Sequence, residues 1–251
     1  MYRLGVVIAG LCVATPVVAE PLGTLWTLEA AERAPTTVAY GQRFFEQRLL
    51  PIKLVRLTAP AAGAPTGSLL YLVYTTRHQI GWCTFKDRSA GNTAKSLFIP
   101  ALDKRPCFFD RDGDGRLDAT FSVFDKYGSM ATPSGNPSDA VPLAQPVPFQ
   151  SIDPHSAPEA MRIAFQLNGS SDPAKVRVTV VLAKGSRNRW DALIGDTPRQ
   201  ANMLRVLNTQ LTVHSVVSKQ AAIAIRTDPD VLVTGSSGGV LTTALRPAFL
   251  Q

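Results

Sequence analysis

The order of hydrophobic and polar residues along the chain predicts a protein built mainly from β-strands. Segment 175–180, "KVRVTV", alternates valine with basic or hydroxyl residues, which is the period of a half-buried strand. Segments 161–167 and 175–182 flank a turn-rich connector and therefore predict a β-hairpin. Similar runs rich in β-branched and aromatic residues predict strands at 50–60, 68–76, 81–85, 119–124, 211–217, 221–227, 230–235 and 239–245.

Helical patterns are few. Residues 198–211, "PRQANMLRVLNTQL", begin with proline and place their large apolar residues on one face, which predicts a helix of about three turns. Residues 27–34 predict one further helical turn. Because helices do not alternate regularly with strands, the pattern argues against βαβ units. We predict a mainly β fold, an antiparallel β-sandwich or barrel-like structure with few short helices.

Residues 1–19 have the pattern of a secretory signal peptide. Arg3 gives a positive start, residues 4–13 form a short apolar core, and residues 17–19 are small enough for signal peptidase. The alternative is a transmembrane anchor, but that needs roughly 20 apolar residues. We expect cleavage before Glu20 and a periplasmic or secreted product. No later run in the sequence reaches membrane-spanning length.

The segment from Ser129 to Glu159 contains seven of the chain's 19 prolines, with serine and alanine between them. This composition predicts an interdomain linker or a long loop across one domain. The part after it contains few large aromatic residues with which to close a separate core. We therefore predict a single β-rich domain over residues 20–251, with the proline-rich loop or linker at 129–159.

Signal cleavage removes Cys12 and leaves an even pair, Cys83 and Cys107. In an exported chain such a pair predicts a disulfide bond. Metal ligation is the alternative, but there is no C-x-x-C motif, and the nearest histidine, His78, is isolated. The chain-entropy relation gives a closed loop of about 25 residues roughly 3.5 kcal/mol of stabilisation. The bond would also anchor one side of an unusual aspartate-rich segment that begins at Asp110.

That segment, "CFFDRDGDGRLDATF", contains four aspartates within nine positions. Carboxylates this close repel one another unless a cation or protons neutralise them. The spacing resembles the D-x-D-x-D-G-x-x-D calcium loop of integrin α-subunit blades, dockerins and EF-hands. The resemblance implies a bend at Gly115 and calcium ligands from alternating carboxylates and one backbone carbonyl. The predicted ligands are Asp110, Asp112, Asp114, the carbonyl of Arg116, and Asp118, bound directly or through a water.

The segment departs from an EF-hand in two ways. Phe121 stands where an EF-hand has a bidentate glutamate, and the flanking residues predict strands instead of helices. The loop is therefore similar to the β-hairpin form, and the sensor behaviour of EF-hands is not implied. Water or Asp125 would replace the missing ligand. We predict a structural calcium ion bound weakly, with a dissociation constant of about 10⁻⁴ to 10⁻³ M. A solvated acidic turn without metal is the alternative.

Enzymatic interpretations fit less well. Residues 108–114 also resemble the first motif of haloacid-dehalogenase-type phosphatases, which implies catalysis by Asp110 and Asp112, but Asp114 replaces the threonine of that motif. Ser237 lies in a G-x-S-x-G match, yet neither an acid nor a histidine follows it, so an esterase is excluded. The histidines lack zinc-ligand spacing, and tryptophans at 26, 82 and 190 are more typical of a core than of a sugar-binding face.

The formal charge of the chain is +7, or +6 without Arg3 of the signal. Basic residues are scattered along the sequence, which disfavours a nucleic-acid partner. We therefore predict an exported, calcium-stabilised, disulfide-bonded β protein that acts as a binding or structural module of the cell envelope. Its partner would be an envelope or extracellular ligand. The alternative is a secreted phosphatase.

Overall fold

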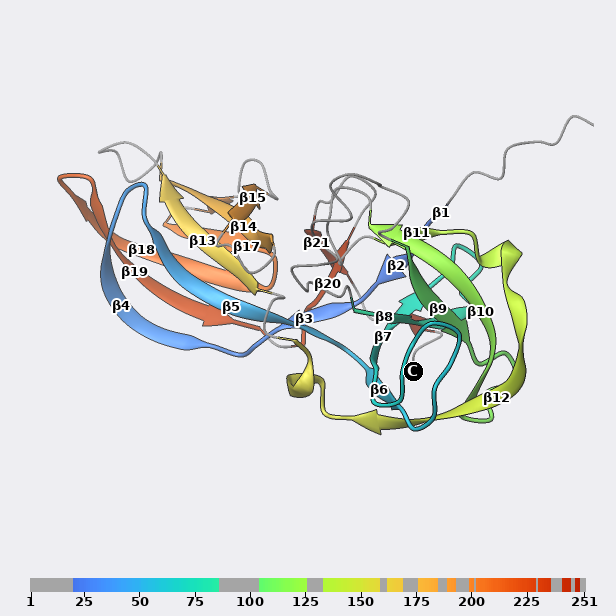
Figure 1. Cartoon of the computed structure of the whole chain (residues 1–251). Helices are drawn as coiled ribbons and strands as arrows, with labels where there is room; N and C mark the ends of the chain where they lie inside the picture. Colours follow the sequence, from blue (N-terminus) through green and yellow to red (C-terminus); the bar gives the residue numbers. More distant parts are fainter. Residues whose placement is uncertain are drawn as a thin grey trace, which may run out of the picture.

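The strand-forming segments assemble into antiparallel sheets in a computed structural model of the chain (Figure 1). The mainly β fold class is confirmed, with a closed barrel and curled sheets. The predicted signal peptide lies outside the described residues. The structure describes residues 20–85, 104–125, 133–158, 162–168, 176–184, 189–192, 199–200, 202–228, 230–235, 241–244 and 247–248.

Six strands form a closed barrel on the right of Figure 1. Each strand pairs with the next one along the chain, and the last pairs with the first to close the ring. Closure leaves the ring without an unpaired edge strand. The six strands are β6 (Leu54–Leu57), β7 (Leu69–Tyr74), β8 (Ile80–Thr84), β9 (Arg105–Phe109), β10 (Arg116–Asp125) and β12 (Val141–Ile152).

Apolar side chains fill the barrel. The rings of Trp82 on β8 and Phe149 on β12 lie 5.5 Å apart between centroids, although β6 and β7 separate these strands in the ring. The two rings therefore meet across the interior. The buried residues of this cluster are Val55, Leu57, Ala61, Ala64, Leu70, Leu72, Trp82, Phe108, Leu117 and Val147.

Three short strands extend the barrel sheet: β1 (Glu20–Pro21), β2 (Gly23–Thr24) and β11 (Pro133–Gly135). β1 pairs with β11, which pairs with β10, and β2 pairs with the end of β7. A Cβ atom at Gly23 would lie 2.1 Å from the ring of Tyr74. Glycine at this position therefore lets the N-terminal segment approach the barrel closely.

Two further sheets pack face to face as a sandwich, on the left of Figure 1. β4 and β5 follow each other in the chain but belong to different sheets. The seven-stranded sheet contains β3 (Trp26–Leu28), β5 (Arg43–Pro51), β13 (Arg162–Asn168), β14 (Arg177–Lys184), β15 (Arg189–Ala192), β20 (Leu232–Gly235) and β21 (Leu241–Ala244). The five-stranded sheet contains β4 (Glu32–Ala39), β16 (Arg199–Gln200), β17 (Met203–Val206), β18 (Thr209–Val217) and β19 (Gln220–Thr227).

A buried polar group joins the two sheets of the sandwich. Gln47 of β5 donates from Nε2 to the carbonyl of Glu29 (2.8 Å) and to the hydroxyl of Thr227 on β19 (2.7 Å). Its Oε1 accepts from the hydroxyl of Thr209 on β18 (3.1 Å). Each polar atom of the amide is therefore paired, as buried polar groups require.

The predicted helix at 198–211 is wrong. This segment forms β16, β17 and the start of β18, joined by a turn in which Leu207 has a φ of 53°. Leu204 and Val206 are buried two positions apart, so their period is that of a strand. The predicted helical turn at 27–34 is also wrong, because these residues fall in β3, β4 and the link between them.

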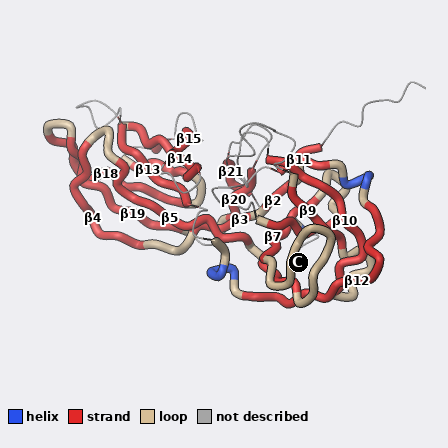
Figure 2. The backbone as a smooth tube through the Cα atoms, viewed as in Figure 1, coloured by secondary structure: helices blue, strands red, loops and turns tan. Residues whose placement is uncertain are grey.

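The proline-rich segment 129–159 is not a loop where it is described. Its longest element is β12, with strand β11 and the 3-10 turns η3 (Pro137–Asp139) and η4 (Pro154–Ser156) beside it (Figure 2). Pro146 falls where the β10–β12 pairing is interrupted, whereas Pro142 and Pro148 lie opposite Ala119 and Arg116 at the ends of the two paired stretches. That residues 20–251 form a single domain stays a prediction.

One predicted strand is divided. Segment 50–60 contains the end of β5 at Pro51 and all of β6 from Leu54, so the chain passes from sandwich to barrel between them. The other predicted strands overlap observed ones, and the predicted hairpin is confirmed as β13–β14, with Asn168 opposite Arg177. Within the described residues, helices are limited to the two 3-10 turns.

Candidate metal centre

The aspartate loop joins two antiparallel strands of the barrel, as the sequence predicted. β9 ends at Phe109, β10 begins at Arg116, and Phe109 lies opposite Ala119. The rings of Phe109 and Phe121 stack with centroids 4.7 Å apart. The base of the loop is therefore fixed by buried aromatic packing, whereas the loop itself lies at the surface.

Asp110 organises the loop backbone. Its Oδ1 accepts a hydrogen bond from the N–H of Gly113 (2.8 Å), and its Oδ2 accepts from the N–H of Gly115 (3.1 Å). Gly113 and Gly115 have φ values of 75° and 82°, in the left-handed region that other residues rarely adopt. The bend expected at Gly115 is present, and Gly113 supplies a second one.

Three of the four predicted carboxylates converge. Oxygen atoms of Asp110, Asp112 and Asp118 all lie within 4.8 Å of one another. Asp114 stands outside this group, because its Oδ1 accepts the N–H of Arg116 (2.8 Å). These three residues form the carboxylate triad of the loop.

Arg111 is a neighbour that the motif did not indicate. Its N–H donates to Oδ2 of Asp118 (2.7 Å), and its Nε lies 3.8 Å from Oδ1 of the same carboxylate. Arg111 occupies a variable position of the pattern, so nothing in the spacing predicts this contact. An ion at the triad would compete with Arg111 for Asp118.

The surroundings of Asp110 disfavour its charged form. Burial raises the pKa of Asp110 above its ordinary value, and the charges of Asp114 and Asp112 raise this pKa further. The N–H groups of Gly115 and Gly113 lower it but do not reverse the shift. A cation at the triad would relieve this cost.

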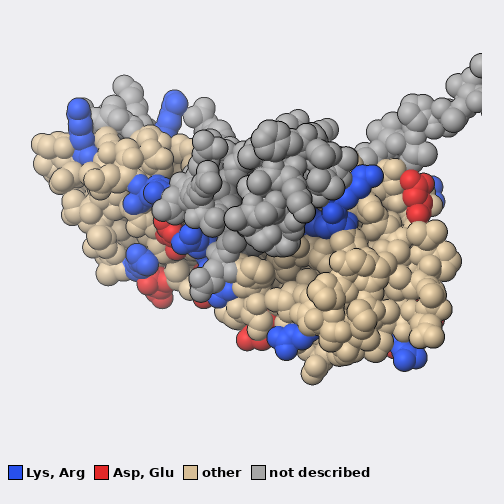
Figure 3. Space-filling model, viewed as in Figure 1, with Lys and Arg blue, Asp and Glu red and all other residues tan. Residues whose placement is uncertain are grey.

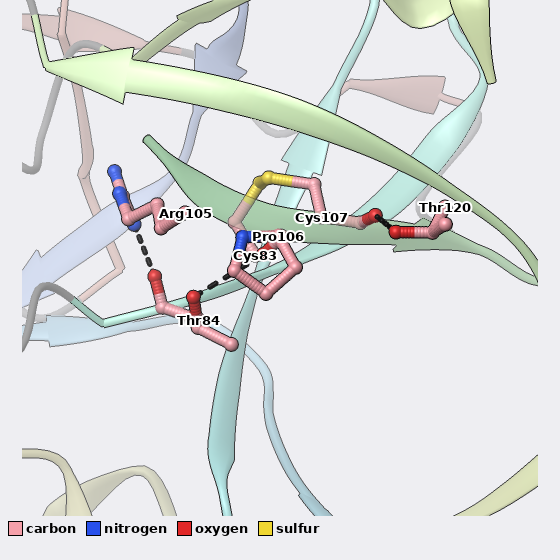
Figure 4. Close-up of a disulfide and its surroundings, with 6 residues drawn as sticks. All are labelled: Cys83, Thr84, Arg105, Pro106, Cys107 and Thr120. Carbon is pink, nitrogen blue, oxygen red and sulfur yellow. Dashed lines mark hydrogen bonds between the residues drawn. A yellow bond between two sulfur atoms is a disulfide. The ribbon is translucent and has the colours of Figure 1, made fainter. Parts of the chain in front are cut away.

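The predicted disulfide pair is confirmed in its geometry. Cys83 on β8 and Cys107 on β9 lie directly opposite each other, with Cα atoms 4.1 Å apart and both residues buried (Figure 4). The hydroxyl of Thr120 donates to the carbonyl of Cys107 (3.0 Å). The guanidinium of Arg105 donates to the carbonyl of Thr84 on the other strand. The bond therefore fastens β8 to the strand that leads into the aspartate loop.

Within the part of the chain that the structure describes, no second set of the sequence candidates comes together. His78, His155 and His214 lie respectively in the β7–β8 turn, in η4 and on β18. The Nδ1 of His155 is 2.9 Å from Oδ1 of Asp153, which also caps η4. Trp26 and Trp82 are buried, in agreement with a core role. Asp125 has no described side chain, and Ser237 lies outside the described residues.

Comparisons with known proteins do not assign the chain to a family. No family profile matches it, and neither curated proteins nor solved structures give a significant match. Among the described residues, no helix has the length and apolar character needed to cross a bilayer. On the visible face, lysine and arginine side chains occur at several separate places (Figure 3).

Proposed function

We propose that the loop between β9 and β10 binds one calcium ion, which stabilises an exported, disulfide-bonded β protein. We further propose that this protein is a binding or structural module of the cell envelope with an extracellular or envelope ligand. The convergence of Asp110, Asp112 and Asp118 is the observation that supports the ion most directly.

The chemistry of these groups suits calcium. Calcium takes six to eight oxygen ligands in flexible geometry, and carboxylates are its usual protein ligands. Asp114 would join the triad after its side chain releases the N–H of Arg116. The carbonyl of Arg116 is the remaining predicted ligand. Arg116 lies opposite Pro148, which has no N–H to donate to it.

The role of the ion would be structural. Phe121, which stacks on Phe109, stands where an EF-hand has its last ligand, so water or Asp125 would complete the coordination. This incomplete set favours weak, extracellular-type affinity. Calcium would neutralise the triad and hold the ends of β9 and β10 together, which is a contribution to stability and not to catalysis.

One observation and one sequence prediction support the proposed location. Paired cysteines at disulfide distance fit an oxidising compartment. The predicted signal peptide fits the same compartment.

No observation favours the phosphatase. That enzyme class needs a parallel sheet with flanking helices around its first aspartate. The strand pairings of the described residues are all antiparallel, and Asp110 follows a barrel strand. The reaction is therefore not proposed for this chain.

Calcium titration tests the proposal. With a dissociation constant of about 10⁻⁴ to 10⁻³ M, calcium at about 1 mM should stabilise the fold by roughly 0.4 to 1.4 kcal/mol. Magnesium should stabilise it less, because magnesium gives up its water ligands reluctantly and demands octahedral geometry. Melting curves that coincide in chelator and in millimolar calcium, with no heat of binding in calorimetry, would exclude the site.

A further inference from the structure

The aspartate loop contains two aspartate–glycine peptides, Asp112–Gly113 and Asp114–Gly115. Asp112, Gly113 and Asp114 are exposed, and Gly115 is half-buried. A Cβ atom added to either glycine would meet no atom within 4 Å. The Cα atoms of both glycines therefore face open space, which leaves the loop room to change its backbone conformation.

We propose that these two peptides are sites of spontaneous isomerisation from aspartate to isoaspartate, and that Asp110 restrains the reaction. In the first step the glycine nitrogen bonds to Cγ of the preceding protonated aspartate, and a five-membered cyclic imide forms. One carboxyl oxygen leaves as water, which carries away the amide proton. Water then adds to one imide carbonyl and opens the ring. Opening at the α-carbonyl sends the main chain through Cγ, and solvent water is the sole co-reactant.

The hydrogen bonds of the loop show how Asp110 restrains this step. Its two carboxylate oxygens accept the N–H groups of Gly113 (2.8 Å) and Gly115 (3.1 Å), which are the two attacking nitrogens. Each nitrogen must leave a charged acceptor and rotate before it reaches the neighbouring Cγ. Hydrogen bonds to ionised acceptors are about twice as strong as neutral ones, so both attacks are slowed by the same side chain.

The structure also orders the two sites. Oδ1 of Asp112 accepts the N–H of Asp114 at 3.3 Å, whereas Oδ1 of Asp114 accepts the N–H of Arg116 at 2.8 Å. The carboxyl group of Asp112 is therefore held less closely. In addition, Arg116 begins strand β10, which limits rotation near Asp114. The shorter hydrogen bond from Gly113 to Asp110 acts in the opposite direction. The expected order, with isoaspartate accumulating faster at 112 than at 114, therefore rests on the carboxyl group of Asp112 and on the strand position of Arg116.

The consequence for cation binding rests on the proposed function. An isoaspartate at position 112 adds one methylene group to the main chain and leaves its carboxylate directly on Cα. This change alters both the spacing of the triad and the reach of one of its members. Aged protein should then lose calcium binding in proportion to its isoaspartate content.

The test compares the folded full chain with Asp110→Ala after prolonged incubation at neutral pH below the melting temperature. Enzymatic methylation counts isoaspartate, and fragmentation mass spectrometry locates it. We expect isoaspartate at 112 above 114, and about a tenfold or larger increase at both in Asp110→Ala, the factor expected when a hydrogen bond to a charged acceptor is lost. Asp153→Ala is the matched control and should behave like the parent, because Asp153 also accepts a backbone N–H but lies outside the loop.

If Asp110→Ala does not fold, a second variant and a measurement on the unfolded parent test the proposal instead. Asp110→Asn retains one acceptor oxygen and should raise isomerisation less than alanine does. The parent chain unfolded in urea should isomerise faster than the folded chain. No isoaspartate at 112 or 114, or equal rates in folded and unfolded parent, would overturn the proposal. So would equal rates in the parent and a folded Asp110→Ala.

Calcium separates this proposal from the proposed function. If the loop binds calcium, millimolar calcium should slow isomerisation of the folded parent, because the ion holds the carboxylates and the backbone together. Isomerisation that is restrained by Asp110 but unaffected by calcium would support the isomerisation sites and contradict the calcium site.

Discussion

Gln47 illustrates how one side chain can determine the relation of two sheets. Its amide pairs with Glu29, Thr209 and Thr227, and the last two lie on the sheet opposite its own. A buried polar group that loses its partner costs free energy, because the partner it leaves behind stays away from water. The sandwich is therefore held in one register by polar contacts as well as by apolar packing.

We expect Gln47→Leu to destabilise the fold by about 2 kcal/mol, since it leaves the carbonyl of Glu29 and the two hydroxyls without their amide partner. Thr209 and Thr227 retain a contact of 3.3 Å, which limits the loss. Urea unfolding measures the change. Gln150→Leu, at an exposed site on β12, should stay within about 0.5 kcal/mol of the parent. Equal losses in the two variants would contradict a specific role for Gln47.

At the aspartate loop, Asp112→Ala should abolish the stabilisation by calcium, about 0.4 to 1.4 kcal/mol at about 1 mM. Without calcium the variant should be no less stable than the parent, because one source of carboxylate repulsion is gone. Thermal melts in chelator and in calcium measure both effects. An equal loss of stability with and without calcium would indicate an ordinary hydrogen-bonded turn.

The sequence motif predicted the position of the aspartate loop between two strands and its bend at Gly115. The spacing predicted that carboxylates converge in the loop, and oxygen atoms of Asp110, Asp112 and Asp118 lie within 4.8 Å of one another. It did not predict that the carboxylate of Asp114 accepts a backbone N–H, or that Arg111, at a variable position of the pattern, contacts Asp118. Local hydrogen bonds between side chains and the backbone compete with metal coordination for the same carboxylates, and residue spacing does not reveal them.

Among the elements, the β8–β9 pair carries the disulfide. Replacing both Cys83 and Cys107 by alanine should lower stability by up to about 3.5 kcal/mol, because the unfolded chain gains freedom that the bond had removed. Guanidinium unfolding of the oxidised parent and the double variant measures this difference. A parent with two free thiols after purification from an oxidising compartment would contradict the bond itself.

Sequence patterns predicted strands better than they predicted helices. Alternation identified β14, and β-branched or aromatic runs identified β7, β8 and β19, because these strands bury one or both faces. The helix at 198–211 was wrong because Leu207 lies in a tight turn, so the apparent helical face joins residues of two strands. The prolines of β12 predicted a loop or linker instead of a strand, and the pairing of β12 with β10 is interrupted over several residues. Tertiary pairing decided both cases.

At the scale of the whole molecule, one apolar cluster extends from barrel to sandwich. It includes Tyr71 on β7, Trp26 on β3 and Phe165 on β13, all fully buried. The rings of Trp26 and Tyr71 lie 5.1 Å apart between centroids. Shared packing of this kind couples the stability of the two parts.

We therefore expect the chain to unfold in a single transition. Trp26→Ala should destabilise barrel and sandwich together by about 3 to 5 kcal/mol. Calorimetry, with fluorescence and circular dichroism on the same samples, measures whether the transitions coincide. Two separate transitions in the parent would show that residues 20–251 form two domains and not one.

Export predicts a mature chain that begins at Glu20, the first residue of β1. Intact-mass measurement of protein recovered from the periplasm or medium should give this N-terminus. Retention of residues 1–19 in a membrane fraction would favour an anchor instead. The control is the same chain expressed without residues 2–19, which should remain in the cytoplasm.

The pairing order has a consequence for the timing of assembly. Several early strands pair with late ones. Trp26 pairs with Val233, β4 pairs with β19, and the pairing of β6 with β12 closes the barrel. During synthesis, which runs from the N-terminus, the early strands are therefore present long before the strands that pair with them. Until then, β3, β4 and β6 present open edges on which other chains can add. The risk of association with other chains should therefore end only when the last strands have formed and paired, long after the first strands have been synthesised.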